Sequence, residues 1–283
     1  MLKRIITALV SLIILLPILY LSNTYVFSVA IGIVTCISLY EMFACVGLKN
    51  KNAVTFPAYL FGAILPTLCK LAGGIDAVLP SACAVMMIYM LYLMMLAVLG
   101  YERYSIKDIS MCFMTAVYII FGFTSIQLIK EMSSNDYLYL LVFVGAWITD
   151  IFAYFSGVLF GKHKLCEAVS PKKTIEGSLG GMIFCSLSFV VFGLIFLNVE
   201  PAVWKIVALA VTGLIISIVS QIGDLVMSLI KRHYGIKDFG KLFPGHGGML
   251  DRFDSIIAVA LTLFILISTV EIFNIELFAW SGK

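Results

Sequence analysis

The chain has 283 residues, of which 62% are hydrophobic and only 12% are charged, and its formal net charge is +3. Because about a quarter of the residues in a typical soluble domain are charged, this composition and a mean hydropathy of +1.08 exclude an ordinary soluble protein. The small net charge is a signal of membrane topology, and we expect no nucleic-acid partner.

Apolar runs long enough to cross roughly 30 Å of hydrocarbon recur along the whole chain. They should be helical, because an open sheet in lipid leaves backbone groups unpaired. The first run follows Lys3 and Arg4 as in a signal peptide, but it lacks a convincing cleavage site and predicts an uncleaved helix. The sequence therefore predicts an all-α, polytopic integral membrane protein with about nine transmembrane helices, over residues 5–21, 25–47, 55–72, 77–99, 110–130, 137–160, 178–198, 203–229 and 253–273.

The distribution of basic residues predicts the orientation. If the N-terminus is placed in the cytoplasm, fifteen of the nineteen Lys and Arg residues fall in inner segments, and only four fall outside. Short cytoplasmic loops are enriched in Lys and Arg. The asymmetry therefore predicts a cytoplasmic N-terminus, an outer C-terminus and an odd number of spans.

Polar residues divide the chain into two parts of one integrated membrane domain. Residues 1–136 are mostly aliphatic and aromatic, with charges at helix ends, although Glu41 lies near the inner end of the second helix. From residue 137 onward, ionisable residues enter the helices, and two long cytoplasmic loops appear at 161–177 and 230–252. We interpret 1–136 as a lipid-facing scaffold and 137–283 as the half that carries the site.

The sixth helix holds the first group of candidate residues. Asp150 and Tyr154 are four residues apart, and Gly157 and Gly161 continue a nearby face. A carboxylate at membrane depth is costly and indicates function by default. The glycines are equally compatible with close helix packing.

The second group follows in the loop and at the next helix start. Pro171 suits the first helical position with Ser170 as N-cap, and Lys172 and Lys173 would add charge to backbone N–H groups that favour phosphate. The other interpretation is a basic loop that only enforces topology. The candidate substrate-binding residues in this group are Ser170, Lys172, Lys173, Thr174, Glu176 and Gly177.

The third group begins at the end of the eighth helix. Asp224, Ser228 and Lys231 share one helix face, and Asp251 and Asp254 are three residues apart at the start of the ninth helix. The two helix ends could bring Asp224 and Asp251 together around a divalent cation, which would offset the repulsion between the acids.

Residues 228–254, the polar island, contain basic residues, carboxylates and five glycines after Tyr234. Such a mixture suits a metal–phosphate site, because phosphate needs donors and Mg²⁺ needs hard oxygen ligands. For His246, a structural hydrogen bond in a tight glycine turn is the alternative to a catalytic role. The bases of the island are Lys231, Arg232, Lys237, Lys241 and Arg252.

The island reads Ser-x2-Lys-Arg-x4-Lys-Asp-x-Gly-x2-Phe-Pro-x-His-Gly-Gly-x2-Asp-Arg-x-Asp from Ser228 to Asp254. This long, chemically mixed pattern resembles the signature of phosphatidate cytidylyltransferases, also called CDP-diacylglycerol synthases. The stretches Ser170–Gly177 and Asp150-x3-Tyr154-x2-Gly157 are also similar to that family.

The resemblance implies Mg²⁺-dependent transfer of CMP from CTP to phosphatidic acid, which gives CDP-diacylglycerol and pyrophosphate in phospholipid biosynthesis. It also implies the plasma membrane of a bacterium, an active site that faces the cytoplasm, membrane lipids as partners, and a homodimer. A second cation is compatible with the chemistry.

Roles for the matching residues follow from the resemblance. The catalytic set is Asp224, Ser228, Lys231, Arg232, His246 and Asp251. The metal ligands are Asp224, Asp251 and Asp254. The substrate-binding set adds to the second group Asp150, Tyr154, Lys237, Asp238, Gly247, Gly248 and Arg252.

Three other functions remain open at this point. A lipid-alcohol kinase would need a base for a hydroxyl acceptor, and Asp150 or Asp238 could serve. A CDP-alcohol phosphatidyltransferase would need an Asp-Gly-x2-Ala-Arg segment, which the sequence lacks. A transporter would hold its acids near the bilayer midplane, whereas these acids cluster toward the cytoplasmic helix ends beside basic loops.

Overall fold

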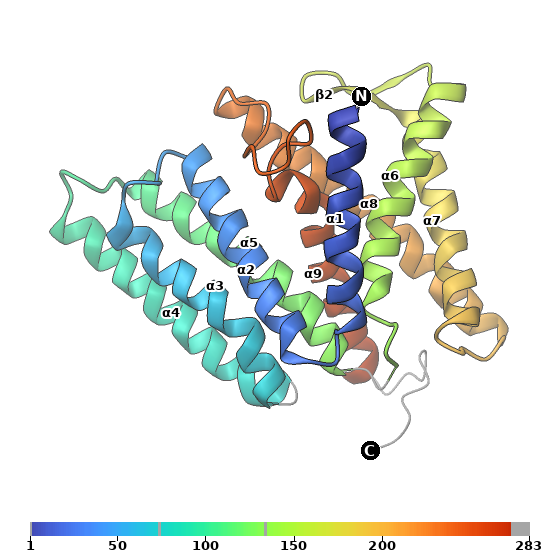
Figure 1. The fold of residues 1–283 in the computed structure, drawn as a ribbon, viewed down its shortest axis with the longest axis horizontal. Helices are drawn as coiled ribbons and strands as arrows, with labels where there is room; N and C mark the ends of the chain where they lie inside the picture. Colours follow the sequence, from blue (N-terminus) through green and yellow to red (C-terminus); the bar gives the residue numbers. More distant parts are fainter. Residues whose placement is uncertain (1, 73–74, 133–134, 273–283) are drawn as a thin grey trace. The chain divides into compact units, whose positions relative to one another are not determined.

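A computed structural model describes residues 2–72, 75–132 and 135–272 (Figure 1). Within these ranges the chain forms nine helices and one two-stranded hairpin, which confirms the predicted all-α polytopic class. Residues 273–283, the last part of the predicted C-terminal half, lie outside the described residues. The elements are α1 (Leu2–Tyr20), α2 (Tyr25–Cys45), α3 (Asn52–Ala72), α4 (Ile75–Leu99), α5 (Ile106–Met132), α6 (Leu140–Phe160), β1 (Lys164–Cys166), β2 (Ser170–Thr174), α7 (Ile175–Ile195), α8 (Val203–His233) and α9 (Leu250–Ile272).

Most of these helices match transmembrane spans. Eight of the described helices, α2 to α9, contain a stretch long and apolar enough to cross a membrane, and α1 contributes the shorter apolar helix Val10–Tyr20. The chain is therefore an integral membrane protein.

The chain divides into two compact units. Unit 1 combines Met1–Met132 with Tyr234–Phe253, and unit 2 combines Ser133–His233 with Asp254–Lys283. The helix α9 begins in unit 1 and continues in unit 2. The division predicted near residue 136 concerned function, and it stays a prediction.

In unit 1, helices α2, α3 and α5 contact one another, and α4 packs on α3 and α5. Their contact buries Leu39, Phe43 and Ile120 completely. The small residue Gly62 of α3 permits this approach, since a Cβ there would lie about 3 Å from side-chain carbons of Thr35 and Leu39. Close packing of this kind is typical of helices in membranes.

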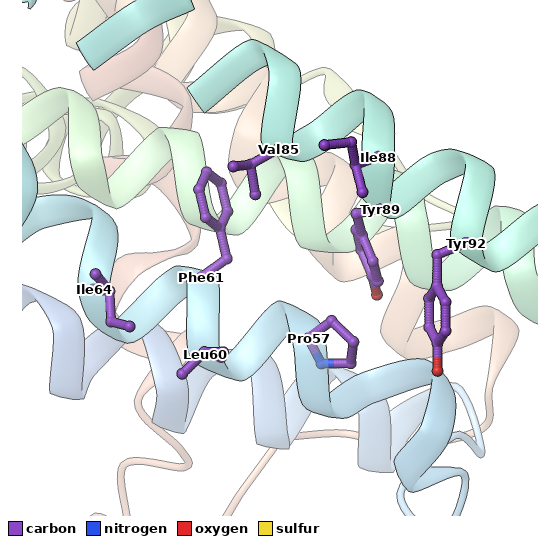
Figure 2. Close-up of a pocket in the computed structure, with 8 residues that line it drawn as sticks. All are labelled: Pro57, Leu60, Phe61, Ile64, Val85, Ile88, Tyr89 and Tyr92. Carbon is purple, nitrogen blue, oxygen red and sulfur yellow. The ribbon is translucent and has the colours of Figure 1, made fainter. Parts of the chain in front are cut away.

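A shallow apolar groove runs along α3 and α4 in unit 1 (Figure 2). Pro57 lies within α3 and has no N–H, so the carbonyl of Ala53, four residues earlier, loses its helical donor. The hydroxyl of Tyr92 donates to that carbonyl at 2.9 Å, and the hydroxyl of Tyr89 donates to the carbonyl of Val54 at 2.8 Å. Tyr92 thus supplies the donor that the proline removes, and Tyr89 adds a second hydrogen bond between α4 and α3.

In unit 2, helices α6, α7 and α8 pack together, and glycines make the α6–α7 contact close. A Cβ on Gly181 would lie 3.0 Å from the carbonyl oxygen of Thr149, and one on Gly157 would lie 2.9 Å from the hydroxyl of Thr174. The structure thus gives Gly157 a packing role, as the second interpretation of this glycine proposed.

One sequence-based expectation about α7 is wrong. The helix begins at Ile175 rather than Pro171, and its N-cap is Thr174 rather than Ser170. A residue before proline is disfavoured in the helical region, and Ser170 instead pairs with Cys166 in the antiparallel hairpin of β1 and β2. The hydroxyl of Thr174 accepts a hydrogen bond from the N–H of Gly177 at 3.1 Å.

The α3–α4 hydrogen bonds lead to a stability prediction. Replacing Tyr92 with Phe should leave the Ala53 carbonyl without a donor and reduce the free energy of unfolding by about 1 kcal/mol. Thermal unfolding in detergent would measure the loss. Tyr101→Phe is the matched control, because Tyr101 is 75% exposed and its hydroxyl donates to the side chain of its neighbour Glu102 at 3.2 Å. Equal melting temperatures for the two variants would contradict the role given to Tyr92.

Candidate active site

The unit 1 part of the polar island, residues 234–253, is folded around Asp251. This side chain is 7% exposed and lies in the first turn of α9, as predicted. Its Oδ2 accepts hydrogen bonds from the N–H groups of Phe239 at 2.8 Å and Gly248 at 2.9 Å. The carboxylate therefore joins the two sides of the loop that precedes α9.

A second carboxylate, Glu41 of α2, binds the next two backbone donors. Its Oε1 accepts from the N–H of Met249 at 2.9 Å, and its Oε2 accepts from the N–H of Leu250 at 2.8 Å. The first N–H groups of a helix have no partner inside the helix, and a negative charge is favoured there by the helix dipole. Glu41 therefore caps α9 from a distant part of the chain.

The glycines of the island fit these carboxylates. Gly245 and Gly247 have φ values of 81° and 86°, which favour glycine. A Cβ on Gly247 would lie 2.8 Å from Oδ2 of Asp251, and one on Gly248 or Gly240 would collide with the Glu41 carboxylate. The predicted substrate role of Gly247 and Gly248 stays a prediction, while their conformational role is visible.

Several island side chains remain exposed around this frame. Those of Lys237, Asp238, Lys241 and Arg252 all reach the surface of unit 1. The ring of His246 is partly buried, and its Nδ1 makes no hydrogen bond to any described group. The structural hydrogen bond considered for His246 is thus not found at Nδ1, and its catalytic role stays a prediction.

The island lies at the same end of unit 1 as the start of α1. The hydroxyl of Thr7 donates to the carbonyl of Pro244 at 3.1 Å. Burial raises the pKa of Tyr234, and the neighbouring Cys45 and Asp108 act in the same direction. These contacts bring together the start of α1, the end of α2 and the start of α5.

In unit 2, Asp224 lies on α8 and forms an ion pair with Lys173 of β2. The Nζ and Oδ2 atoms are 2.5 Å apart, and about a quarter of each side chain is exposed. Because α8 extends to His233, Ser228 and Lys231 share the helix with Asp224 as predicted. The structure thus joins members of the second and third groups.

Asp254 lies close to this pair because α8 and α9 cross tightly at Gly223. A Cβ on Gly223 would lie 2.7 Å from the Cβ of Ala258 and 3.3 Å from the carbonyl oxygen of Asp254. The carboxylate of Asp254 experiences the charges of Asp224, Asp150 and Lys231, and its Oδ2 lies 4.0 Å from Nζ of Lys231. Asp224 of α8 and Asp254 of α9 therefore each lie beside a lysine, and the charge of Asp150 on α6 also reaches Asp254.

Glu176 holds the start of the basic loop. Its carboxylate accepts hydrogen bonds from the N–H groups of Lys162 and His163, and its Oε1 lies 2.6 Å from Nδ1 of His163. The side chains of Lys162, which precedes β1, and Lys172, which lies in β2, are both exposed. Glu176 therefore orders the segment that carries Lys172 and Lys173.

The other predicted site residues lie outside these ion pairs and hydrogen bonds. Asp150 is exposed, and Tyr154 is 66% exposed and packs edge-on against Phe155. Arg232 is exposed near the end of α8. Gly177 is buried against α6, so its visible role is packing.

The donor chemistry suits a divalent cation, because carboxylate oxygens are the hard ligands that Mg²⁺ prefers. In the described parts of the chain, no group of three or more His, Cys, Asp or Glu side chains is already drawn together tightly enough to hold an ion. Lysines neutralise the acids instead. Asp224 and Asp251 belong to different units, and their predicted pairing stays a prediction.

Sequence reasoning missed the roles of two residues. Glu41 was noticed as an acid within a helix, but nothing in its spacing indicates that it binds residues 249–250. His163 gave no signal at all. Glu41 could have been singled out because an ionised side chain within a transmembrane helix is energetically unfavourable unless it has a partner.

Comparison with known proteins identifies the family of the chain. Residues 2–270 match the model of the cytidylyltransferase family. A phosphatidate cytidylyltransferase of Staphylococcus aureus (strain COL) is 39% identical over 274 residues, which cover 93% of this chain and 98% of that protein. Phosphatidate cytidylyltransferases of Staphylococcus saprophyticus and Staphylococcus haemolyticus are each 36% identical, with the same coverage. The chain, with its paired acids and lysines, therefore belongs to the cytidylyltransferase family.

Proposed function

We propose that this chain transfers CMP from CTP to phosphatidic acid and releases pyrophosphate, which gives CDP-diacylglycerol for phospholipid biosynthesis. The family and the names of the relatives support this nucleotidyltransferase activity. The observation that carries it in the structure is the group formed by Asp150, Asp224 and Asp254 with Lys173 and Lys231 in an integral membrane protein.

The reaction needs little acid–base chemistry. A phosphate oxygen of phosphatidic acid attacks the α-phosphorus of CTP, and the bond from that phosphorus to the bridging oxygen of the β-phosphate breaks. Since the acceptor is already an anion, catalysis consists of bringing two anions together, aligning them and stabilising the pyrophosphate that leaves. The protein therefore has to supply positive charge at fixed positions.

The basic residues divide this task in our proposal. Lys172, Lys173 and Lys237 bind triphosphate oxygens, and Lys231, Arg232 and Arg252 bind the phosphate of phosphatidic acid. Ser228 and Glu176 orient their neighbours; for Glu176 the hydrogen bonds to the backbone of residues 162–163 support this role. The remaining substrate-binding and catalytic residues retain the roles that the resemblance implies.

The acids of unit 2 would hold Mg²⁺ through Asp224 and Asp254, with Asp150 in support. A divalent cation held by these acids would supply positive charge that offsets the repulsion between the two anionic substrates. Lys173 and Lys231 now balance these acids, and both lysines would become free to bind phosphate when a cation replaces them. Asp251 is retained as a further ligand on the strength of the family signature alone.

We further propose that the protein lies in the plasma membrane of a bacterium with its N-terminus and its site in the cytoplasm. The excess of basic residues in the inner segments supports this orientation. The contact from Thr7 to Pro244 agrees with it, because it brings the start of α1 to the polar island. Assembly into a homodimer is an expectation that rests on the resemblance.

Product analysis tests the proposed function directly. Purified protein in detergent with CTP, Mg²⁺ and phosphatidic acid should release pyrophosphate and form CDP-diacylglycerol, and omission of any one component should abolish release. Formation of CDP together with a phosphorylated lipid alcohol would instead identify a lipid kinase. Uptake of a solute into vesicles without conversion of CTP would identify a transporter.

The proposed metal ligands lead to a second prediction. Asp224→Asn should lower kcat by about 100-fold or more, because removal of one group that stabilises transition-state charge costs this much in other enzymes. Glu200→Gln is the matched control, since Glu200 is an exposed acid of unit 2 whose Oε2 lies 3.1 Å from Nζ of Lys205. Near-normal turnover of Asp224→Asn at limiting Mg²⁺ would contradict the assignment.

The proposed triphosphate ligands lead to a third prediction. Lys173→Met should raise the KM for CTP by about tenfold, the loss expected when one charge-assisted hydrogen bond to phosphate is removed. Steady-state kinetics with varied CTP at saturating phosphatidic acid would measure the change. Lys205→Met provides the comparison in the same unit, and an unchanged KM in Lys173→Met would exclude Lys173 as a CTP ligand.

A further inference from the structure

We propose that Glu41 is a positioning residue for the reaction. Its carboxylate would fix the conformation of the island loop, residues 237–250, and so determine where Lys237 and Asp238 meet the substrate. Glu41 lies on α2, far in sequence from the family signature, and none of the roles above includes it. The inference rests on the proposed function of the loop.

The carboxylate of Glu41 forms its hydrogen bonds with this loop. Each of its two oxygens accepts one backbone N–H, from Met249 and from Leu250, and the side chain is 5% exposed. A carboxylate in such surroundings is stable only when hydrogen bonds replace its water. Conversely, the two N–H groups have no acceptor inside α9. The two partners therefore require each other.

The loop is shaped to receive this carboxylate at more than one point. A Cβ on Gly240 or on Gly248 would collide with the Glu41 carboxyl group. These glycines lie on opposite sides of the turn around His246, and both press on the same side chain. Glu41 thus contacts the loop at Gly240, at Gly248 and at the start of α9.

Glu41 is linked through Gly248 and Asp251 to the segment that carries the exposed residues Lys237 and Asp238. Gly248 touches Glu41 and also donates its N–H to Asp251, whose same oxygen accepts the N–H of Phe239. Phe239 directly follows Lys237 and Asp238 in the chain. A displacement at residues 248–250 would therefore pass through Asp251 to the two residues proposed to meet the substrate.

Glu41→Gln tests this role with little change in volume. The amide keeps one acceptor but turns an NH₂ group toward a backbone donor. Amide hydrogen exchange at Met249 and Leu250 should accelerate by about tenfold or more, as expected for a locally loosened segment. The KM for CTP should rise by about tenfold, because the loop that carries Lys237 is displaced while Lys173 of unit 2 is kept.

Glu131→Gln is the matched control. Glu131 is a partly buried acid of the same unit, and its Oε1 binds Lys70 at 2.9 Å and Gln127 at 2.7 Å, at the end of α5 opposite to Asp108. This variant should leave the KM for CTP and the exchange of residues 249–250 unchanged. If both variants raise KM equally, the effect is general destabilisation and the proposal is wrong.

A second variant approaches the same contact from the loop. Gly248→Ala places a methyl group against the Glu41 carboxylate and should give the same rise in exchange and in the KM for CTP, and it decides the question if Glu41→Gln does not fold. Wild-type exchange and wild-type KM in a folded variant would overturn the proposal. Failure of the wild-type protein to form CDP-diacylglycerol would overturn the proposed function instead, and the exchange data would still report whether Glu41 holds the loop.

Discussion

Each buried acid of this membrane protein needs a partner of opposite or complementary polarity, and this requirement organises the polar half of the structure. Hydrocarbon offers no water to a carboxylate, so an unpaired charge at membrane depth is costly. Glu41 and Asp251 meet the requirement with backbone N–H groups, and Asp224 meets it with a lysine. Asp254 combines the two, since it accepts the N–H of Ser255 and lies 4.0 Å from Lys231. Two different solutions thus separate acids that shape the chain from acids whose charge is balanced by a movable side chain.

This separation bears on the chemistry. A backbone N–H cannot leave its carboxylate without unfolding the loop, whereas the lysine head group of Lys173 or Lys231 needs only a rotamer change to reach a neighbouring anion. The acids paired with lysines are therefore the ones suited to exchange partners during a catalytic cycle. The acids bound by backbone groups are suited to keep one geometry throughout.

Much of the fold was predictable because hydrocarbon imposes length and apolarity on every span. The predicted ends of α2, α4 and α9 agree with the observed ends to within about three residues, in line with the usual uncertainty of helix ends. The start of α7 was predicted wrongly because a proline can begin a helix or sit in an extended hairpin, and the pairing of Ser170 with Cys166 decides between them. The link from Glu41 to Leu250 joins residues more than 200 positions apart, and no local pattern encodes such a contact. The sequence motif predicted which residue types make up the candidate site. It could not predict which acid pairs with which lysine, because this depends on how α8 and α9 cross at Gly223.

The proline within α3 has a consequence for how the protein enters the membrane. Of the eight candidate spans, α3 is the least hydrophobic and α4 is among the most hydrophobic, and the hydroxyl of Tyr92 on α4 supplies a donor to the Ala53 carbonyl in the first turn of α3. An α3 segment that entered the membrane alone would lack this donor at the end where its apolar stretch begins. During synthesis, α3 should therefore leave the translocation channel together with α4 as a helical hairpin rather than as an independent span.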